Sequence, residues 1–330
     1  MDKRLSALTR WINARFKSGA RNLRPASTDA SFRRYFRFDH DGQSYIVMDA
    51  PPEHENMEVY IQTARRFRDI GLNVPEIIDQ NLDQGFLLIS DLGQTTYLDH
   101  LNEHNVDRLY GDALGALIVL QTGTLINPGA FPRYDKTLLL SEMALFPKWY
   151  ADKHFGYSLH AEQLDVIEDT FGILCESALG QPQVWVHRDY HSRNLMVTAN
   201  NNPGVLDFQD AVTGPITYDL VSLLRDCYIE WPPGQVREWA LGYQNLARQS
   251  GLLLSDDEDQ FVRWFDHMSL QRHIKVLGIF ARLYHRDGKS DYLNDLPLVW
   301  KYAMAVCRDY ANLHAFGELL QELQPPPCTL

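Results

Sequence analysis

The chain has 330 residues, of which 45% are hydrophobic, and this length and composition are sufficient for two packed lobes. Its net charge of −12 argues against nucleic acid as a partner, because binding to a phosphate backbone requires a basic surface. The four cysteines (Cys175, Cys227, Cys307, Cys328) form no C-x-x-C pair, and no run of 18 apolar residues occurs; we therefore expect reduced, mostly buried thiols, no zinc site and no membrane contact, in a cytoplasmic protein.

The first ninety residues predict a small antiparallel sheet with two helices. Apolar residues recur at helical spacing near the start, Asp41-Gly42 is a strong hairpin signal, and Gly71 ends the second helical pattern. In chain order we expect a helix over 5–16, two strands within 21–38 joined at the polar tip 27–31, a strand over 45–48, a helix over about 55–70, and strands over 74–78 and 85–90.

Residues 91–93 (Asp-Leu-Gly) predict a linker, and the pattern beyond it is almost entirely helical. The expected helices are 102–122, 135–155, 160–179, 217–231, 235–250, 255–286 and 295–322. We therefore expect two lobes, a β-rich N-terminal lobe over 1–91 and a mainly helical C-terminal lobe over 92–330.

The most informative stretch is HRDYHSRN at 187–194, followed by VLDF at 205–208, which places Asp189, Asn194 and Asp207 at gaps of five and thirteen residues. A tight loop would present Asp189 as a proton acceptor and Asn194 as a metal ligand. A hairpin over 195–206 would return Asp207 to the side of Asn194. Two adjacent oxygen ligands suit Mg²⁺, so the spacing predicts phosphoryl transfer with these three catalytic residues converging between the lobes.

This order of motifs resembles the protein kinases and their small-molecule relatives. The segment GPITYDL at 214–220 is similar to that of the aminoglycoside phosphotransferase and choline kinase family, and no A-P-E segment of a protein kinase follows. The resemblance implies an α+β, bilobal protein-kinase-like fold, with a small antiparallel β-sheet N-lobe and a larger, mainly helical C-lobe. It implies that the N-terminal lobe over 1–91 is nucleotide-binding and that the C-terminal lobe over 92–330 is catalytic and substrate-binding. It also implies ATP and Mg²⁺ as cofactors, and a structural role for Asp219 in tying down the catalytic loop.

Three further segments resemble the bacterial N-acetylmuramate/N-acetylglucosamine anomeric kinases: TDASFRRYFR at 28–37, VMDAPP at 47–52 and QRHIKVLGIFARLYHRDGK at 271–289. That resemblance implies phosphorylation of the C1 hydroxyl of an amino sugar during peptidoglycan recycling, by a monomer whose partner is this small-molecule substrate. Two alternatives stay open. One is a kinase of the same fold for an aminoglycoside, choline or homoserine, and the other is a nucleotide-binding pseudokinase.

The nucleotide site departs from the kinase pattern at two places. The third strand reads Ile46-Val47-Met48-Asp49, so the lysine that would pair with the phosphates is missing, and the tip with Ser27 and Ser31 contains no glycine. Polar groups in a tight turn can still bind phosphates. The resemblance also places backbone groups of the segment from Ser90 to Leu92 against the adenine.

An arginine of the second strand can supply the missing positive charge, with Arg33, Arg34 and Arg37 as candidates. Strand alternation puts Arg33 and Arg37 on one face and Arg34 on the other, and the sequence leaves open which face looks inward. Glu58 on the following helix is the expected anchoring acid, with a solvated carboxylate as the alternative.

Substrate contacts beyond Asp189 are expected from Glu142 and Trp149, which fall at helical spacing with Phe146 and Tyr150. Acids accept sugar hydroxyl protons and aromatic rings stack on sugar faces, although such a stripe is also typical of a core. Arg193 can bind an anionic acceptor such as a lactyl carboxylate, or pair with a structural acid. Arg272, Lys275 and Arg282 can act likewise or face solvent.

Overall fold

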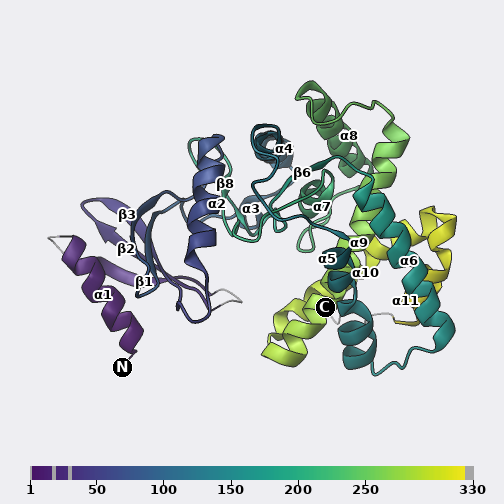
Figure 1. The fold of residues 1–330 in the computed structure, drawn as a ribbon, viewed down its shortest axis with the longest axis horizontal. Coiled ribbons are helices and arrows are strands. Elements are labelled where there is room, and N and C mark those ends of the chain that lie inside the picture. The colour runs from purple at the N-terminus through teal and green to yellow at the C-terminus, as the bar shows by residue number, and fades with distance from the viewer. Residues whose placement is uncertain (1, 17–19, 29–31, 324–330) are drawn as a thin grey trace. The chain divides into compact units, whose positions relative to one another are not determined.

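The computed structural model describes residues 2–16, 20–28 and 32–323. Contacts divide the chain into two compact units, Met1–His100 with Asn194–Gln209 and Leu101–Arg193 with Asp210–Leu330 (Figure 1). The first unit thus includes residues 92–100 and the hairpin 194–209 in addition to the predicted lobe 1–91. Each unit has the predicted composition of a protein-kinase-like fold, one with an antiparallel sheet and the other mostly helical.

The first unit is built on a five-stranded antiparallel sheet in the order β1-β2-β3-β5-β4. The strands are β1 (Arg21–Thr28), β2 (Arg34–His40), β3 (Gln43–Asp49), β4 (Ile77–Asn81) and β5 (Phe86–Ser90). The remaining elements are the helices α1 (Lys3–Arg15), α2 (Met57–Asp69) and α3 (Tyr97–His100), and the hairpin of β7 (Leu195–Met196) and β8 (Gly204–Val205).

Helix α1 covers one face of this sheet through an apolar cluster, and Figure 1 shows α2 beyond the other face. The cluster joins Leu8 and Ile12 of α1 to strand residues that alternate along the sheet: Phe36, Phe38, Val47, Phe86 and Leu88. Residues two apart in a strand share a face, so Arg34 lies with Phe36 on the α1 face. Arg33 and Arg37 belong to the opposite face.

Asp49, at the end of β3, links α1 to the sheet. Its side chain is 0% exposed. Arg4 of α1 donates from Nε to Oδ1 at 2.9 Å, and Arg34 donates from Nε to Oδ2 at 3.0 Å. The third strand, which lacks the lysine found in kinases, therefore ends in a carboxylate that is bound by two arginines on the α1 face.

The hairpin 194–209 belongs to the core of the first unit, although it comes late in the chain. Phe208 is fully buried, with its ring 4.8 Å from that of Tyr60 and 5.8 Å from that of Phe67. The amide of Val205 donates to the carbonyl oxygen of Asn73 at 2.7 Å. These contacts attach the predicted metal-binding hairpin to α2 and to the segment that follows it.

The second unit is helical apart from one two-stranded antiparallel pair, β6 (Gln183–Val186) with β9 (Val212–Pro215). Its helices are α4 (Val106–Ile126), α5 (Lys136–Met143), the π-helix η1 (Phe146–His154), α6 (Ala161–Leu179), α7 (Tyr218–Leu224), α8 (Pro233–Gln249), α9 (Glu258–Asp287), η2 (Ser290–Asp295), α10 (Leu296–Asp309), η3 (Ala311–Leu313) and α11 (His314–Glu322). The long helix α9 packs against the other major helices and against η1.

Three predicted helices are interrupted in the structure. The expected helix 135–155 is α5 followed by the separate π-helix η1, and the expected helix 295–322 breaks between α10 and α11. The expected helix 217–231 stops at Leu224, because the Asp226 carboxylate accepts hydrogen bonds from the backbone amides of Ser192 and Tyr228 at 2.9 Å and 3.1 Å. The Asp226 side chain thus accepts the hydrogen bond from the Tyr228 amide that a backbone carbonyl would accept in a continuing helix.

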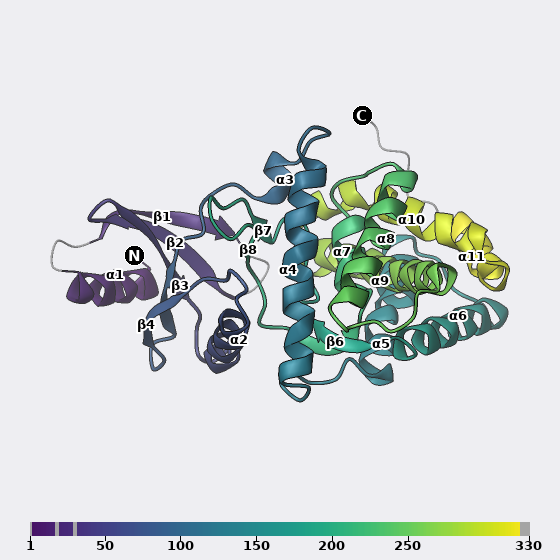
Figure 2. The ribbon, with the colours of Figure 1, turned by 90° about the horizontal axis from the view of Figure 1, so that it is seen from above.

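Within the described residues, α4 is one helix that is long and apolar enough to cross a membrane by length and composition alone. It packs against β6 and α8 (Figure 2), and nine of its residues are buried, which is typical of a core helix. Cys175, Cys227 and Cys307 are buried free thiols, as expected, and Cys328 lies outside the described residues.

Candidate active site

The three predicted catalytic residues are divided between the two units. Asp189 belongs to the second unit, in the loop that follows β6, and Asn194 and Asp207 belong to the first unit, at the two ends of the β7–β8 hairpin. Each part of the site is therefore built from the elements of its own unit.

Asp219, in the first turn of α7, holds the loop that carries Asp189. Its carboxylate accepts hydrogen bonds from the backbone amides of His187 at 2.6 Å and Arg188 at 3.0 Å. Burial raises the pKa of Asp219 to about 7, although these two hydrogen bonds lower it. The geometry confirms the structural role predicted for this residue.

The residue before Asp189 has a constrained backbone. Arg188 has a φ of 78°, in the left-handed region that is unfavourable for a long side chain. Arg272 of α9 donates from Nη1 to the carbonyl oxygen of Arg188 at 2.9 Å, while Asp219 accepts from its amide. Hydrogen bonds on both sides of Arg188 therefore fix the direction in which the chain enters Asp189.

The surroundings of Asp189 favour its ionised form. Burial raises the pKa of this carboxyl, but the electrostatic effects of Lys275, His191 and Arg272 together lower it by more, and the net pKa lies below its ordinary value. Asp189 is therefore a carboxylate near neutral pH. It is able to accept a proton from a hydroxyl group.

Glu142 of α5 lies in a buried network of charges beneath this loop and is 6% exposed. It accepts hydrogen bonds from the Tyr134 hydroxyl and the Arg188 guanidinium, and lies 3.0 Å from the Lys275 ammonium. These cations lower the pKa of Glu142 although burial raises it. The contacts give Glu142 a positioning role, and its direct contact with a sugar stays a prediction.

Two cations of α9 complete this network. Arg272 and Lys275 are 6% and 7% exposed, so neither faces solvent. Lys275 donates from Nζ to the Tyr218 hydroxyl at 2.9 Å, and the Arg272 guanidinium lies 4.8 Å from the centre of the same ring. Arg282, the third candidate on this helix, is partly exposed.

The β7–β8 hairpin brings the two predicted metal ligands together in the first unit. The amide of Leu206 donates to the carbonyl oxygen of Asn194 at 2.9 Å, next to Asp207 in the chain. Asp207 has a φ of 61°, and its Oδ1 accepts a hydrogen bond from Gln209 at 2.9 Å. The side chains of Asn194 and Asp207, at the two ends of this hairpin, offer an amide oxygen and a carboxylate, which are hard oxygen donors and fit Mg²⁺.

Arg33 is the arginine of the β2 segment that lies with these groups. Its Nε is 3.5 Å from Oε2 of Glu55, and both side chains are largely covered. Burial raises the pKa of the Tyr60 hydroxyl, the charge of Arg33 lowers it and that of Asp207 raises it, so both charges act on one hydroxyl group. The charges of Arg33 and of the predicted metal ligand Asp207 therefore both act on the surroundings of Tyr60.

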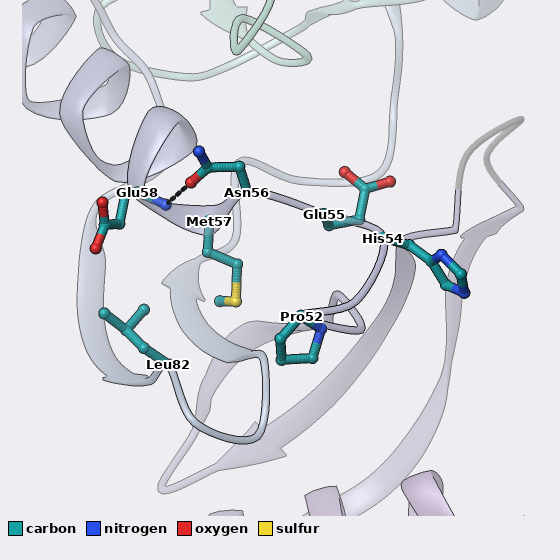
Figure 3. A pocket seen from close by; sticks show the side chains of 7 residues that line it. All are labelled: Pro52, His54, Glu55, Asn56, Met57, Glu58 and Leu82. Carbon is teal, nitrogen blue, oxygen red and sulfur yellow. Dashed lines mark hydrogen bonds between the residues drawn. The ribbon is translucent and has the colours of Figure 1, made fainter.

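The acid that anchors this arginine is Glu55 and not the expected Glu58. Asn56 caps α2 by accepting a hydrogen bond from the amide of Glu58 at 3.0 Å. Figure 3 shows the side chains of Glu55 and Glu58 pointing away from each other on either side of this cap. Glu58 is exposed, so the alternative of a solvated helix carboxylate applies to it.

The other two arginines of β2 are bound elsewhere. Arg34 pairs with Asp49 and Asp2 on the α1 face. Arg37 pairs with Asp91 at 2.5 Å and donates to the carbonyl oxygen of Gly93 at 2.6 Å, which ties β2 to the linker.

The remaining predicted nucleotide contacts stay predictions. The amide and hydroxyl of Ser90 both bond to the backbone of Glu76, at 2.9 Å and 2.8 Å. Leu92 lies over Gly204 of β8, where its side chain leaves no room for a Cβ atom. Ser27 pairs with Tyr35 in the β1–β2 register, and Ser31 lies outside the described residues.

The two remaining substrate candidates differ in their surroundings. Trp149 is partly exposed on η1, whereas Phe146 and Tyr150 of the same stripe are buried and stack with ring centres 5.4 Å apart. Arg193 follows Asp189 in the catalytic loop and lies over the ring of Tyr228. Contact of Trp149 or Arg193 with an acceptor stays a prediction.

The chain matches the model of the phosphotransferase enzyme family over residues 22–254, more than half of its length. It belongs to this family. A protein from Pseudomonas putida named N-acetylmuramate/N-acetylglucosamine kinase is 43% identical over 98% of this chain and 97% of its own. Proteins with the same name from Pseudomonas aeruginosa and Neisseria meningitidis are 45% and 41% identical, and cover 91% and 96% of this chain and 88% and 95% of their own.

Solved structures of lower identity agree on the fold of this phosphotransferase. The choline kinase LicA from Streptococcus pneumoniae has a TM-score of 0.62 at 11% identity, covering 91% of this chain and 99% of its own. The ADP-bound aminoglycoside phosphotransferase APH(2'')-Ib has a TM-score of 0.56 at 18% identity, covering 91% and 97%. The predicted kinase-like fold and family are confirmed.

Several residues of the site were not identified from the sequence. Tyr134 and Tyr218 bind the charged network. Tyr218 lies in the segment 214–220 that resembles the family, but nothing in the sequence marks either tyrosine as a partner of buried charges. Lys275 and Arg272 had a usable signal, because they lie within the apolar run of α9 that includes Leu270, Ile274 and Leu277. A charged residue in the buried stripe of a helix requires a partner.

Proposed function

We propose that this phosphotransferase transfers the γ-phosphoryl group of ATP to the anomeric hydroxyl of N-acetylmuramate and N-acetylglucosamine, in peptidoglycan recycling. The observation that carries the proposal is the identity of 41–45% over nearly the whole chain to relatives with this kinase name. The catalytic loop and the metal-binding hairpin supply the chemistry that such a reaction requires.

Asp189 is the proposed base. As a carboxylate surrounded by cations, it accepts a hydrogen bond from the sugar hydroxyl, orients it for in-line attack and takes its proton. An anomeric hydroxyl is more acidic than an ordinary alcohol, so a carboxylate is a better matched base here than for a primary alcohol. The transfer is direct, without a covalent enzyme intermediate.

Asn194 and Asp207 would hold Mg²⁺ through their side-chain oxygens. A bound Mg²⁺ supplies charge neutralisation at the β- and γ-phosphates. Arg33, anchored by Glu55, takes the place of the missing strand lysine and binds phosphate oxygens with its planar donors. ATP as the donor is supported by the family and by the ADP-bound neighbour.

The proposed enzyme acts in the cytoplasm as a monomer on a small-molecule amino sugar. Another acceptor of the same family, such as choline or an aminoglycoside, is the nearest alternative. The pseudokinase alternative arose from the missing lysine, and the Arg33–Glu55 pair supports the proposal that Arg33 substitutes for it.

The test is to incubate the purified protein with ATP, Mg²⁺ and N-acetylmuramate and to locate the phosphate of the product by NMR. We expect phosphate on C1 and no turnover of choline. Asp189→Asn should abolish most turnover and leave ATP binding nearly intact. Phosphate on another hydroxyl, or full activity of Asp189→Asn, would contradict the proposal.

A further inference from the structure

The guanidinium of Arg193, in the catalytic loop, lies flat on an aromatic ring and is partly exposed to solvent. Its central carbon lies 3.5 Å from the centre of the Tyr228 ring and 6.0 Å from that of Tyr292. One face of the planar group is thus occupied by an aromatic ring, whereas its N–H donors point along the edge. Within residues 2–16, 20–28 and 32–323, this guanidinium donates no hydrogen bond, and its side chain is 44% exposed.

A carboxylate lies near these N–H donors but is too far away to accept a hydrogen bond from them. Oδ2 of Asp295 is 3.9 Å from Nη2 of Arg193, beyond hydrogen-bond distance. In the same unit, Arg225 also lies over an aromatic ring, that of Phe265, yet it binds the Asp266 carboxylate at 2.6 Å. Arg225 is therefore hydrogen-bonded to its carboxylate, whereas Arg193 is only near one.

The position of Arg193 is fixed before any acceptor binds. The Asp226 carboxylate accepts hydrogen bonds from the amides of Ser192, next to Arg193, and of Tyr228, at 2.9 Å and 3.1 Å. One buried side chain therefore holds both the loop and the ring on which the guanidinium lies. Such preorganisation reduces the entropy that binding costs.

Arg193 is within reach of an acceptor at Asp189. The two residues are four positions apart, a span of at most about 14 Å, and the amide of His191 bonds to the carbonyl oxygen of Asp189 at 3.1 Å, which tightens the loop. In N-acetylmuramate the lactyl carboxylate is attached at C3, two ring carbons from the reacting C1 hydroxyl. N-acetylglucosamine differs by lacking this group.

We propose that Arg193, held flat on Tyr228, binds the carboxylate of an acidic sugar acceptor and thereby favours N-acetylmuramate over its neutral analogue. Asp295 opposes this preference, because its negative charge lies beside the same edge of the guanidinium. Burial raises the pKa of Asp295 to about 6, against the lowering effect of Arg193, which indicates that this pair alone does not compensate for desolvation. This inference rests on the proposed function and names a residue that sets its substrate preference.

The experiment measures kcat/KM for N-acetylmuramate and N-acetylglucosamine and compares their ratio between variants. Arg193→Gln should lower the ratio at least about tenfold, equivalent to ~1.4 kcal/mol, through the loss of charge-assisted hydrogen bonds. Asp295→Asn should raise it about threefold by removing the opposing charge while keeping the shape. Arg248→Gln is the matched control, since Arg248 of α8 lies 3.7 Å from the carboxylate of Asp256 in a similar exposed pair, and the ratio for this variant should equal that of the wild type.

The outcomes separate the two proposals. A wild type that phosphorylates neither sugar would refute the proposed function. If both sugars react and Arg193→Gln lowers both rates equally, or Asp295→Asn lowers the ratio, the subsite is refuted and the kinase activity stands. Because both side chains reach solvent, folding of the variants is checked by their melting temperatures.

Discussion

Arg272 of α9 donates a hydrogen bond of 2.9 Å to the carbonyl oxygen of Arg188, the residue immediately before the proposed base Asp189. This single contact connects the longest helix of the second unit to a peptide with a φ of 78°. Because this contact is made to the backbone just before Asp189, Arg272 is a positioning residue for the catalytic loop.

Arg272→Met should lower kcat at least about tenfold, because the backbone before Asp189 loses the donor that fixes it and a misplaced base is a poor catalyst. The affinity for ATP, measured by calorimetry, should change much less than kcat. Arg263→Met is the control, since Arg263 is an exposed arginine of the same helix. Equal losses in both variants would exclude a specific role for Arg272.

Lys275→Met should move the acidic limb of the pH profile of kcat/KM toward higher pH. Lys275 is the largest of the charges that hold the pKa of Asp189 below its ordinary value, with His191, Arg272 and His187 contributing less. A base must be ionised to act, so a raised pKa makes activity fail earlier as the pH falls. Lys301→Met, which alters an exposed pair with Glu230, should leave the limb in place, and an unchanged limb in Lys275→Met would contradict this role.

Arg33→Met and Arg34→Met should have different effects although the residues are neighbours. Loss of Arg33 removes the cation proposed to bind phosphate oxygens, so KM for ATP should rise about tenfold or more. Arg34 lies on the α1 face with Asp49, so its loss should lower the melting temperature and leave KM for ATP near the wild-type value. The reverse result would show that the inward face of β2 has been misassigned.

Asp49→Asn should reduce the free energy of unfolding by about 2 kcal/mol. The buried carboxylate accepts charge-assisted hydrogen bonds from both Arg4 and Arg34, and the amide can serve only one of them. Thermal unfolding measures the effect, with Asp79→Asn as the control, because Asp79 forms a partly exposed pair with Arg15 and accepts one hydrogen bond from the adjacent amide of Gln80. A loss no larger than in the control would mean that α1 is held by its apolar contacts alone.

The sequence predicted most of the framework of this protein. Strand alternation and hairpin signals identified the antiparallel sheet, and the spacing of Asp189, Asn194 and Asp207 identified the loop and the hairpin that carry them. These features could be predicted because each depends on local chemistry: a turn, a period or a fixed gap between ligands.

The rest depended on contacts between distant segments. The sequence could not show which face of β2 is covered by α1, and so could not choose between Arg33 and Arg34. It indicated Glu58 as the anchor, whereas the cap at Asn56 leaves Glu55 to pair with Arg33. It indicated Glu142 as a sugar ligand, which stays a prediction, and could not show its partners Arg188 and Lys275, which come from two other elements.

The hairpin 194–209 has a consequence for how this chain can be synthesised and dissected. Phe208 completes a core that otherwise consists of residues from the first hundred positions. On the ribosome, the sheet and its two helices must wait until residue 209 has emerged before that core is filled. A truncated product ending near position 100 will therefore expose apolar surface and aggregate, and gene fusions that exchange whole lobes between relatives must carry this late insert along with the amino-terminal part.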